Sequence, residues 1–163
     1  MKPALRPATA ADLPFLWEML YEAAYWDPTG VRPPTEAFLA DDHNVRYLEG
    51  WARAGDFGVI AASPSGERIG AAWARRFPAT RAAWGYVDEA TPELGFAVRA
   101  GYRGQGVGAA LLSALIETAR AAGVPALSLS VAAANPARRL YSRTGFIEYA
   151  TSGGSITMLL TVP

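Results

Sequence analysis

The sequence predicts an α/β fold, with helices packed on a mixed sheet. Its 163 residues are enough for one domain with a sizeable core and too few for two, so we expect residues 1–163 to form one unit. Hydrophobic residues make up 51% of the chain and charged residues 18%, as in an ordinary globular protein. Helical periods and strand-like runs follow each other in the order β-α-α-β-β-β-α-β-α-β-β, which indicates the α/β class.

The first third of the chain is predicted to hold one strand and two helical segments. Thr9 is a suitable cap for a helix over 9–26. Apolar residues recur there at helical spacing: Leu13, Leu16, Trp17, Leu20 and Tyr21. We expect Trp17 and Tyr21 to pack in the core. The other ranges are a strand at 4–9, a Pro- and Gly-rich loop at 27–36, and one or two short helices over 35–55.

The middle of the chain is predicted to form a hairpin and then a third strand. Two apolar runs flank the turn signal "SPSG" within 56–77, as in a β-hairpin. The connection 78–92 has no clear pattern. Residues 93–99 alternate Leu94, Phe96 and Val98 with Glu93, Gly95 and Ala97, which is typical of a strand.

The last part of the chain is predicted to contain two helices and three strands. Gly145 suits the end of a short helix that Asn135 caps and Pro136 begins. The ranges are a helix from the glycines to about 122, a strand at 126–131, the short helix at 135–145, and the strands "FIEYA" and "SITMLLTV". The second of these, at 155–162, looks exposed and apolar, so it is a candidate edge for a homodimer.

The stretch "YRGQGVGAALL" predicts a site for a pyrophosphate. Gly104, Gly106 and Gly108 allow close approach of the backbone and precede a helix, whose N-terminus attracts anions. Arg103 adds a full positive charge. The alternative is a glycine-rich turn that binds nothing, because such patterns are common.

Two known phosphate motifs fit this stretch poorly. Gly104, Gly106 and Ala109 satisfy the letters of the dinucleotide fingerprint, but five residues separate them from the preceding strand and no acidic ribose partner follows. A dinucleotide-binding domain therefore stays open as an alternative function. The P-loop requires a Gly-Lys-Ser/Thr ending, and this loop ends Gly-Ala-Ala.

The composition excludes several classes of function. There is no cysteine, which removes disulfides, thiol nucleophiles and thiolate metal sites. A single histidine, His43, argues against a metal centre or a catalytic triad, and we expect it on the surface. The net charge is zero, so nothing favours nucleic acid or an acidic membrane as a partner. No apolar run suggests a signal peptide or a membrane span, and a cytoplasmic protein is expected.

Residues 93–146 resemble the core of the GNAT superfamily of N-acetyltransferases. The family pattern Arg/Gln-x-x-Gly-x-Gly/Ala is matched by Arg103, Gly106 and Gly108. A second motif, an Asn followed by a helix that ends Tyr-x-x-x-Gly-Phe, is matched by Asn135, Tyr141 and the pair Gly145–Phe146. The resemblance implies a mixed, mostly antiparallel central sheet flanked by helices, and transfer of an acetyl group from acetyl-CoA to an amine without a metal.

The resemblance also implies a binding site for acetyl-CoA. In the family, two parallel strands splay, here 93–99 and 126–131, and the pantetheine arm enters between them. Backbone groups of Phe96 and Val98 would contact that arm. The remaining implied contacts are the backbone of Arg103, Gly104, Gln105, Gly106, Val107 and Gly108 with the pyrophosphate, Ala109 beside them, Asn135 with pantetheine and Tyr141 with the sulfur.

The chemistry of acyl transfer to an amine assigns roles to a few residues. The reaction needs proximity, a polarised carbonyl, a neutral amine and a proton for the leaving thiolate. A backbone N–H near Val98 can polarise the carbonyl, and Tyr141 can protonate the thiolate. Glu93 is the first candidate for the general base, with Glu89 and Asp88 as alternatives. Each of these two roles has a purely structural alternative. Tyr141 could simply pack in the core, and Glu93 could be a solvated end of the strand.

The acceptor is predicted to be a primary amine of a small molecule or a peptide. Tyr25 and Trp26 border the Pro-rich loop and are candidates for the acceptor pocket. A non-catalytic acyl-CoA binding or sensor module is the alternative function. Four arginines are expected on the solvated surface, where one of them could reach a coenzyme phosphate: Arg75, Arg76, Arg138 and Arg139.

Overall fold

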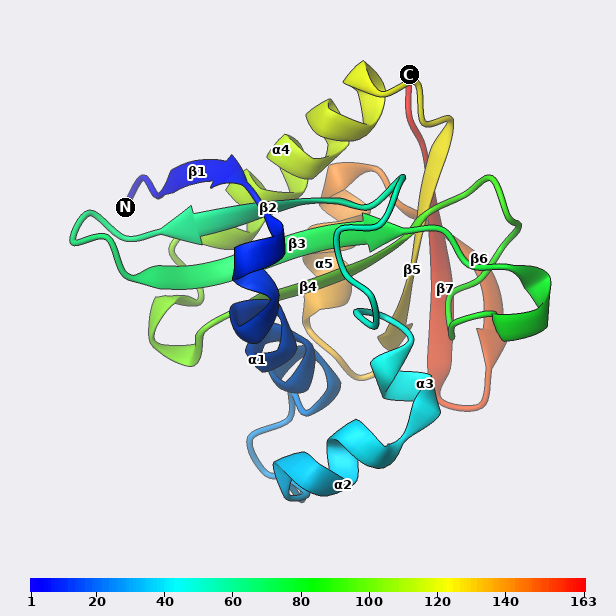
Figure 1. Cartoon of the computed structure of the whole chain (residues 1–163), viewed down its shortest axis with the longest axis horizontal. Coiled ribbons are helices and arrows are strands. Elements are labelled where there is room, and N and C mark those ends of the chain that lie inside the picture. The colour runs from blue at the N-terminus through cyan, green and yellow to red at the C-terminus, as the bar shows by residue number, and fades with distance from the viewer.

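The computed structural model describes residues 1–163 and contains one seven-stranded sheet with the strand order β1-β2-β3-β4-β5-β7-β6 (Figure 1). Only the β4–β5 pair is parallel. The predicted fold class, a mixed and mostly antiparallel sheet flanked by helices, is therefore confirmed. The strands are β1 Ala4–Pro7, β2 Phe57–Ala62, β3 Arg68–Arg75, β4 Glu93–Val98, β5 Ala126–Ala132, β6 Ile147–Ser152 and β7 Ser155–Thr161.

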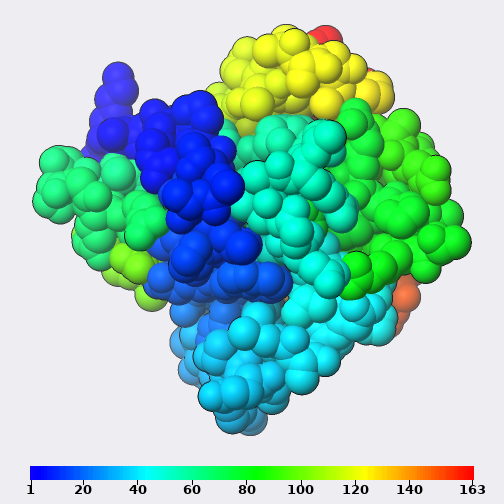
Figure 2. Space-filling model, in the orientation of Figure 1, coloured from blue at the N-terminus to red at the C-terminus, as the bar shows by residue number.

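Helices cover both faces of the sheet. They are α1 Leu13–Ala24, α2 Thr35–Ala40, α3 Asp42–Val45, α4 Val107–Ala121 and α5 Ala137–Thr144. Figure 1 shows α1 in front of the sheet and α5 behind it. Figure 2 shows that α1, the segment around α2 and α3, and the loop before β4 together cover the front face.

Each face of the sheet has its own hydrophobic core. On the α1 face, Leu16, Phe38 and Trp73 are fully buried together. On the α4 face, Leu111 and Leu127 belong to a larger buried cluster. A sheet buried on both faces needs apolar residues on both, which explains the apolar run Ile69–Ala74 within β3.

Helix α1 lies close to its predicted range, but its buried stripe is shifted by one residue. Thr9 forms a capping box with Asp12 on a short 3₁₀ turn that precedes the helix. The residues of α1 that are fully buried are Phe15, Leu16, Met19 and Leu20. Trp17 and Tyr21 are only partly buried and pack at the border of the core, so their assignment to the core was partly wrong.

Two expectations about exposure are wrong. Strand β7, which contains "SITMLL", lies between β5 and β6, and the edge strand is β6. Strand β7 is paired along both edges, and its alternate residues Ile156, Met158 and Leu160 are buried because they face the core on the α4 side. Arg75 is fully buried rather than solvated, since its guanidinium pairs with Asp56 at 2.6 Å. A homodimer stays a prediction.

Candidate active site

The site begins where β4 and β5 separate. A single bridge, Glu93 with Ser128, joins these two strands, and the Ser128 N–H donates to the Pro92 carbonyl at 3.0 Å. Beyond it β4 stays paired with β3, while β5 stays paired with β7 along its whole length. Because each strand follows its other partner, a gap opens between them. The gap is a cavity of about 780 Å³.

The main chain of β4 offers hydrogen-bonding groups to this cavity. In an antiparallel ladder, alternate residues direct their N–H and C=O groups to opposite sides. Arg99 donates to Ile69 on the β3 side, and the Pro92 carbonyl accepts from the β5 side. The even-numbered residues between them, which include Phe96 and Val98, therefore turn their main chain toward the gap. This geometry agrees with the backbone contacts that we expected from these two residues.

The glycine bend lies at the open end of the gap. Gly104 and Gly106 have φ angles of +73° and +86°, a conformation that strains any residue with a Cβ. No atom lies within 4 Å of the position that a Cβ would take at either glycine, so the bend faces open space. Gly106 caps α4 without a side-chain hydrogen bond, and the first N–H groups of this 15-residue helix are free to bind an anion.

Arg103 anchors the bend to β4. Its Nε donates to the Val98 carbonyl at 2.9 Å, and its Nη2 lies 3.7 Å from a Glu22 carboxylate oxygen. The guanidinium is therefore committed to protein partners, and its charge is partly neutralised by Glu22. Arg143 of α5 also lines the cavity and pairs with no carboxylate. Arg138 does not line it; it pairs with Glu148 instead, at 2.7 Å.

Most of the predicted coenzyme-binding residues line the cavity. They are Phe96, Val98, Arg103, Gly104, Gly106, Gly108, Ala109, Asn135 and Tyr141. Two others do not. The Gln105 side chain is exposed and donates to the Gly101 carbonyl at 3.2 Å. The Val107 side chain is buried in the core, which leaves only its main-chain N–H for a ligand.

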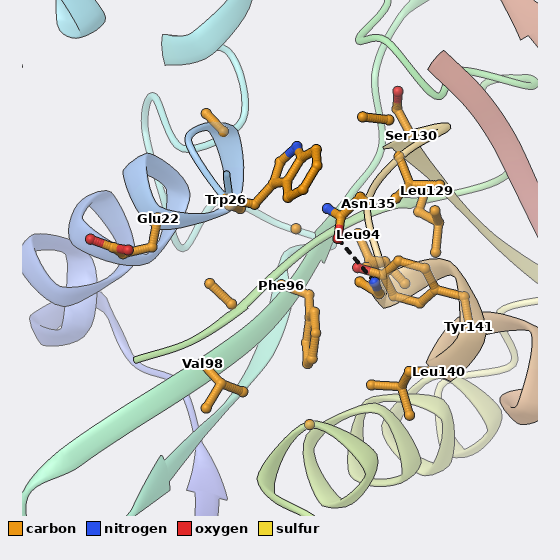
Figure 3. A pocket seen from close by; sticks show the side chains of 18 of the residues that line it. Glu22, Trp26, Leu94, Phe96, Val98, Leu129, Ser130, Asn135, Leu140 and Tyr141 are labelled. Atoms are coloured by element: carbon orange, nitrogen blue, oxygen red, sulfur yellow. Dashed lines mark hydrogen bonds between the residues drawn. The ribbon is translucent and has the colours of Figure 1, made fainter. Parts of the chain in front are cut away.

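Asn135 and Tyr141 face the cavity from the α5 side (Figure 3). The Asn135 Oδ1 accepts the Ala137 N–H at 2.9 Å, so this side chain closes a turn ahead of the helix, which is capped by Pro136. The Tyr141 ring packs edge-on against Phe96 with 5.9 Å between ring centroids. Burial raises the pKa of the Tyr141 hydroxyl, so it stays protonated at neutral pH. The ring therefore belongs to the core, while the residue still lines the cavity.

Glu93 lies at the closed end of the gap and is not a solvated strand end. It is 1% exposed, and its Oε1 accepts the Gly85 N–H at 3.0 Å. Its Oε2 accepts the Tyr47 hydroxyl. Burial raises the pKa of Glu93 to about 7, and the two hydrogen bonds oppose that rise. A carboxyl with this pKa can take up and release a proton near neutral pH.

The two alternative bases lie elsewhere. Glu89 accepts the Ala79 N–H and Asp88 accepts the Ala90 N–H, each at 3.0 Å. Both bonds are exposed features of the loop before β4, and neither carboxylate lines the cavity.

The acceptor side of the cavity is formed by α1, by the segment after α3 and by the loop before β4. Trp26 lines it across from Tyr141 (Figure 3). Tyr25 does not line it, because its ring packs on Tyr21 at 4.9 Å and on Phe38 at 5.8 Å. Residues that the sequence did not indicate also line it, among them Leu20, Asn44, Tyr47 and Trp84. His43 is exposed, as expected, and stacks on Trp84.

Comparison with known proteins identifies the family. A model described as "Acetyltransferase (GNAT) family" matches residues 17–146. This chain belongs to the GNAT acetyltransferase family. Two curated relatives are each 32% identical over 151 residues, which is 90% of this chain and 81% of theirs. They are the L-methionine sulfoximine/L-methionine sulfone acetyltransferases of Pseudomonas paraeruginosa and Pseudomonas aeruginosa.

Solved structures of acetyltransferases share the fold over almost the whole chain. The paiA N-acetyltransferase of Thermoplasma acidophilum, in complex with coenzyme A, has a TM-score of 0.71 and 18% identity, with 99% of both chains covered. The yncA protein of Salmonella typhimurium, with acetyl-CoA, has a TM-score of 0.70 and 22% identity, with 100% of this chain and 95% of that chain covered. At these identities the likeness establishes the fold of this GNAT protein.

As a member of this family, the protein is an acetyl-CoA-dependent acetyltransferase. The cavity fits that co-substrate, because an open glycine bend, a helix N-terminus and the free main chain of one strand follow each other from one end to the other. No group of three or more metal-ligating side chains is present in the GNAT domain. None of its helices is long and apolar enough to span a bilayer.

Proposed function

We propose that this protein acetylates the primary amine of a small molecule or a peptide by direct transfer from acetyl-CoA in a ternary complex. The observation that carries the proposal is the placement of Glu93. A buried carboxyl with a pKa of about 7 lies at the closed end of a cavity whose open end is a pyrophosphate-type glycine bend. A site that only stores acyl-CoA has no need of a proton acceptor there.

The coenzyme side of the cavity supplies binding and polarisation. Main-chain N–H groups from Arg103 to Ala109 would hold the pyrophosphate, and Asn135 would contact the pantetheine arm with its amide. The N–H of Val98 faces the gap and would polarise the thioester carbonyl. Fixed main-chain dipoles suit this task because they need no reorganisation during the reaction.

Two ionisable residues would move the protons. Glu93 would take a proton from the incoming ammonium, directly or through another group, and leave a neutral amine to attack the thioester. Tyr141, whose raised pKa keeps it protonated, would donate to the departing thiolate. Glu93 thus takes one proton from the amine before the carbon–nitrogen bond forms, and the proton that the amine loses afterwards returns Tyr141 to its neutral form.

The curated relatives favour a small molecule as the acceptor. The relatives from Pseudomonas are named for L-methionine sulfoximine and L-methionine sulfone, which carry one primary amine each. We therefore infer that a small amino-acid-type amine is the first acceptor to test. Acetyl-CoA is made inside cells, so the proposal places the enzyme in the cytoplasm.

Two measurements test the proposal. Calorimetric titration with acetyl-CoA is expected to show binding below millimolar concentration, and no binding at that concentration would end it. Release of free thiol is then measured with L-methionine sulfoximine, other amino acids, aminoglycosides, polyamines and peptides. Binding without thiol release for any amine would instead support an acyl-CoA sensor, and a preference for NAD would support a dinucleotide-binding domain.

A further inference from the structure

The carboxylate of Glu93 lines the cavity but is almost completely enclosed by protein. The side chain is 1% exposed, and each of its oxygens already accepts a hydrogen bond, from the Gly85 N–H and from the Tyr47 hydroxyl. Each carboxylate oxygen has one further acceptor position, but at 1% exposure Glu93 offers an ammonium group almost no surface to approach, whereas Tyr47 is 8% exposed.

The hydroxyl of Tyr47 is oriented by its surroundings. It donates to Glu93 Oε2 and accepts the Trp84 N–H at 3.2 Å. A phenol oxygen has one proton and two acceptor positions, so one acceptor position remains. Tyr47 lines the acceptor side of the cavity together with Glu93 and Trp84, so an acceptor amine bound there lies next to this side chain.

We propose that Tyr47 is a catalytic residue that connects the acceptor amine to Glu93. The phenol oxygen accepts a proton from the acceptor ammonium while the phenol proton moves to the Glu93 carboxylate. One N–H bond and one O–H bond break, one O–H bond re-forms on Tyr47 and one forms on Glu93. The products are a neutral amine, an unchanged phenol and a neutral carboxyl, so charge and atoms balance. This inference rests on the function proposed above.

The environment of Tyr47 suits a relay better than a separate base. Burial and the neighbouring Glu93 both raise the pKa of its hydroxyl, so Tyr47 does not ionise by itself near neutral pH. The ring is held edge-on against Phe77 with 5.6 Å between centroids. The guanidinium of Arg46 lowers the pKa of Tyr47, but this effect is smaller than those of burial and of Glu93, and Arg46 is itself paired with Asp42.

The test compares pH profiles of kcat/KM for the amine in Tyr47→Phe and in the wild type. Two effects are expected. Loss of the hydroxyl removes a hydrogen bond that lowers the pKa of Glu93, so the acid limb moves to higher pH. Loss of the relay also lowers the plateau at high pH by roughly 10²-fold. A residue that only positions Glu93 would shift the limb and leave the plateau within twofold, which would overturn the inference.

A matched control is available outside the cavity. The Tyr102 hydroxyl donates to Glu67 at 2.6 Å, in an exposed pair of the same chemistry. Tyr102→Phe is expected to leave both the plateau and the acid limb unchanged. Affinity for acetyl-CoA, measured by calorimetry, is expected to stay the same in Tyr47→Phe, because Tyr47 lies on the acceptor side.

A double variant keeps the test valid if Tyr47→Phe alone makes the protein too unstable to fold. In the Glu93→Gln background no buried charge remains to be stranded. Tyr47→Phe is expected to add less than a threefold loss there, because two residues that act as one unit do not contribute separately. A further tenfold loss would mean that Tyr47 acts independently of Glu93, and would overturn the relay. If Glu93→Gln alone keeps the full rate, the proposed function loses its base, which is a separate failure.

Discussion

The raised pKa of Glu93 makes a prediction about stability as well as activity. Burial moves this pKa from 4.5 to about 7 in the folded protein. Between these two values the folded state holds a proton that the unfolded state has released, so the free energy of unfolding falls as pH rises. One pKa unit corresponds to about 1.4 kcal/mol, which gives a total of ~3 kcal/mol. Roughly 2–3 kcal/mol of this lies between pH 5 and pH 8.

Glu93→Gln removes this titration. Between pH 5 and pH 8 we expect the free energy of unfolding of the variant to rise by about 2–3 kcal/mol relative to that of the wild type, whatever the difference between the two proteins at pH 5. Urea denaturation of both proteins at pH 5, 6.5 and 8 measures the difference. The same substitution is expected to abolish the acid limb and most of the rate. A difference in stability that does not change with pH would refute the reasoning, because it would show that Glu93 titrates alike in the folded and unfolded states.

Three further substitutions test other parts of the structure. Tyr141→Phe is expected to lower turnover roughly 10²-fold with little change in the affinity for acetyl-CoA; unchanged turnover across pH would remove its role as the acid. Gly85→Ala places a Cβ 2.6 Å from the Leu129 carbonyl carbon, so the free energy of unfolding measured in urea is expected to fall by about 1–3 kcal/mol. The acid limb of the kcat/KM profile is expected to move to higher pH. Arg75→Met removes the buried partner of Asp56, which keeps only its longer contacts with Arg53, and is expected to lower the free energy of unfolding by about 3–5 kcal/mol; a loss below 1 kcal/mol would count against a buried ion pair.

The coenzyme half of the site was predictable because its signals are local. The glycine bend and the start of α4 are contiguous, and positive φ angles at Gly104 and Gly106 are what the glycines suggested. The spacing from Asn135 to Tyr141 is short as well, and both residues line the cavity. In each case neighbours along the chain carry the information, so no knowledge of the sheet was needed.

The acceptor half was less predictable because it joins distant segments. Tyr47 and Glu93 are 46 positions apart and meet only through the packing of the segment after α3 against β4. Trp84 and Gly85 lie in the connection 78–92, which has no recognisable pattern. Between Tyr25 and Trp26, only the direction in which each side chain leaves the end of α1 decides which one reaches the cavity.

The sequence by itself determined the order of helices and strands, the glycine bend and the family motifs, because hydrophobic periodicity and backbone freedom are properties of short segments. The tertiary structure alone decided that β7 lies inside the sheet, that Arg75 is buried with Asp56 and that Glu93 is removed from water. These outcomes depend on which distant residues exclude solvent around each group. Charge, burial and pKa are set by that environment, and it exists only once the chain has folded.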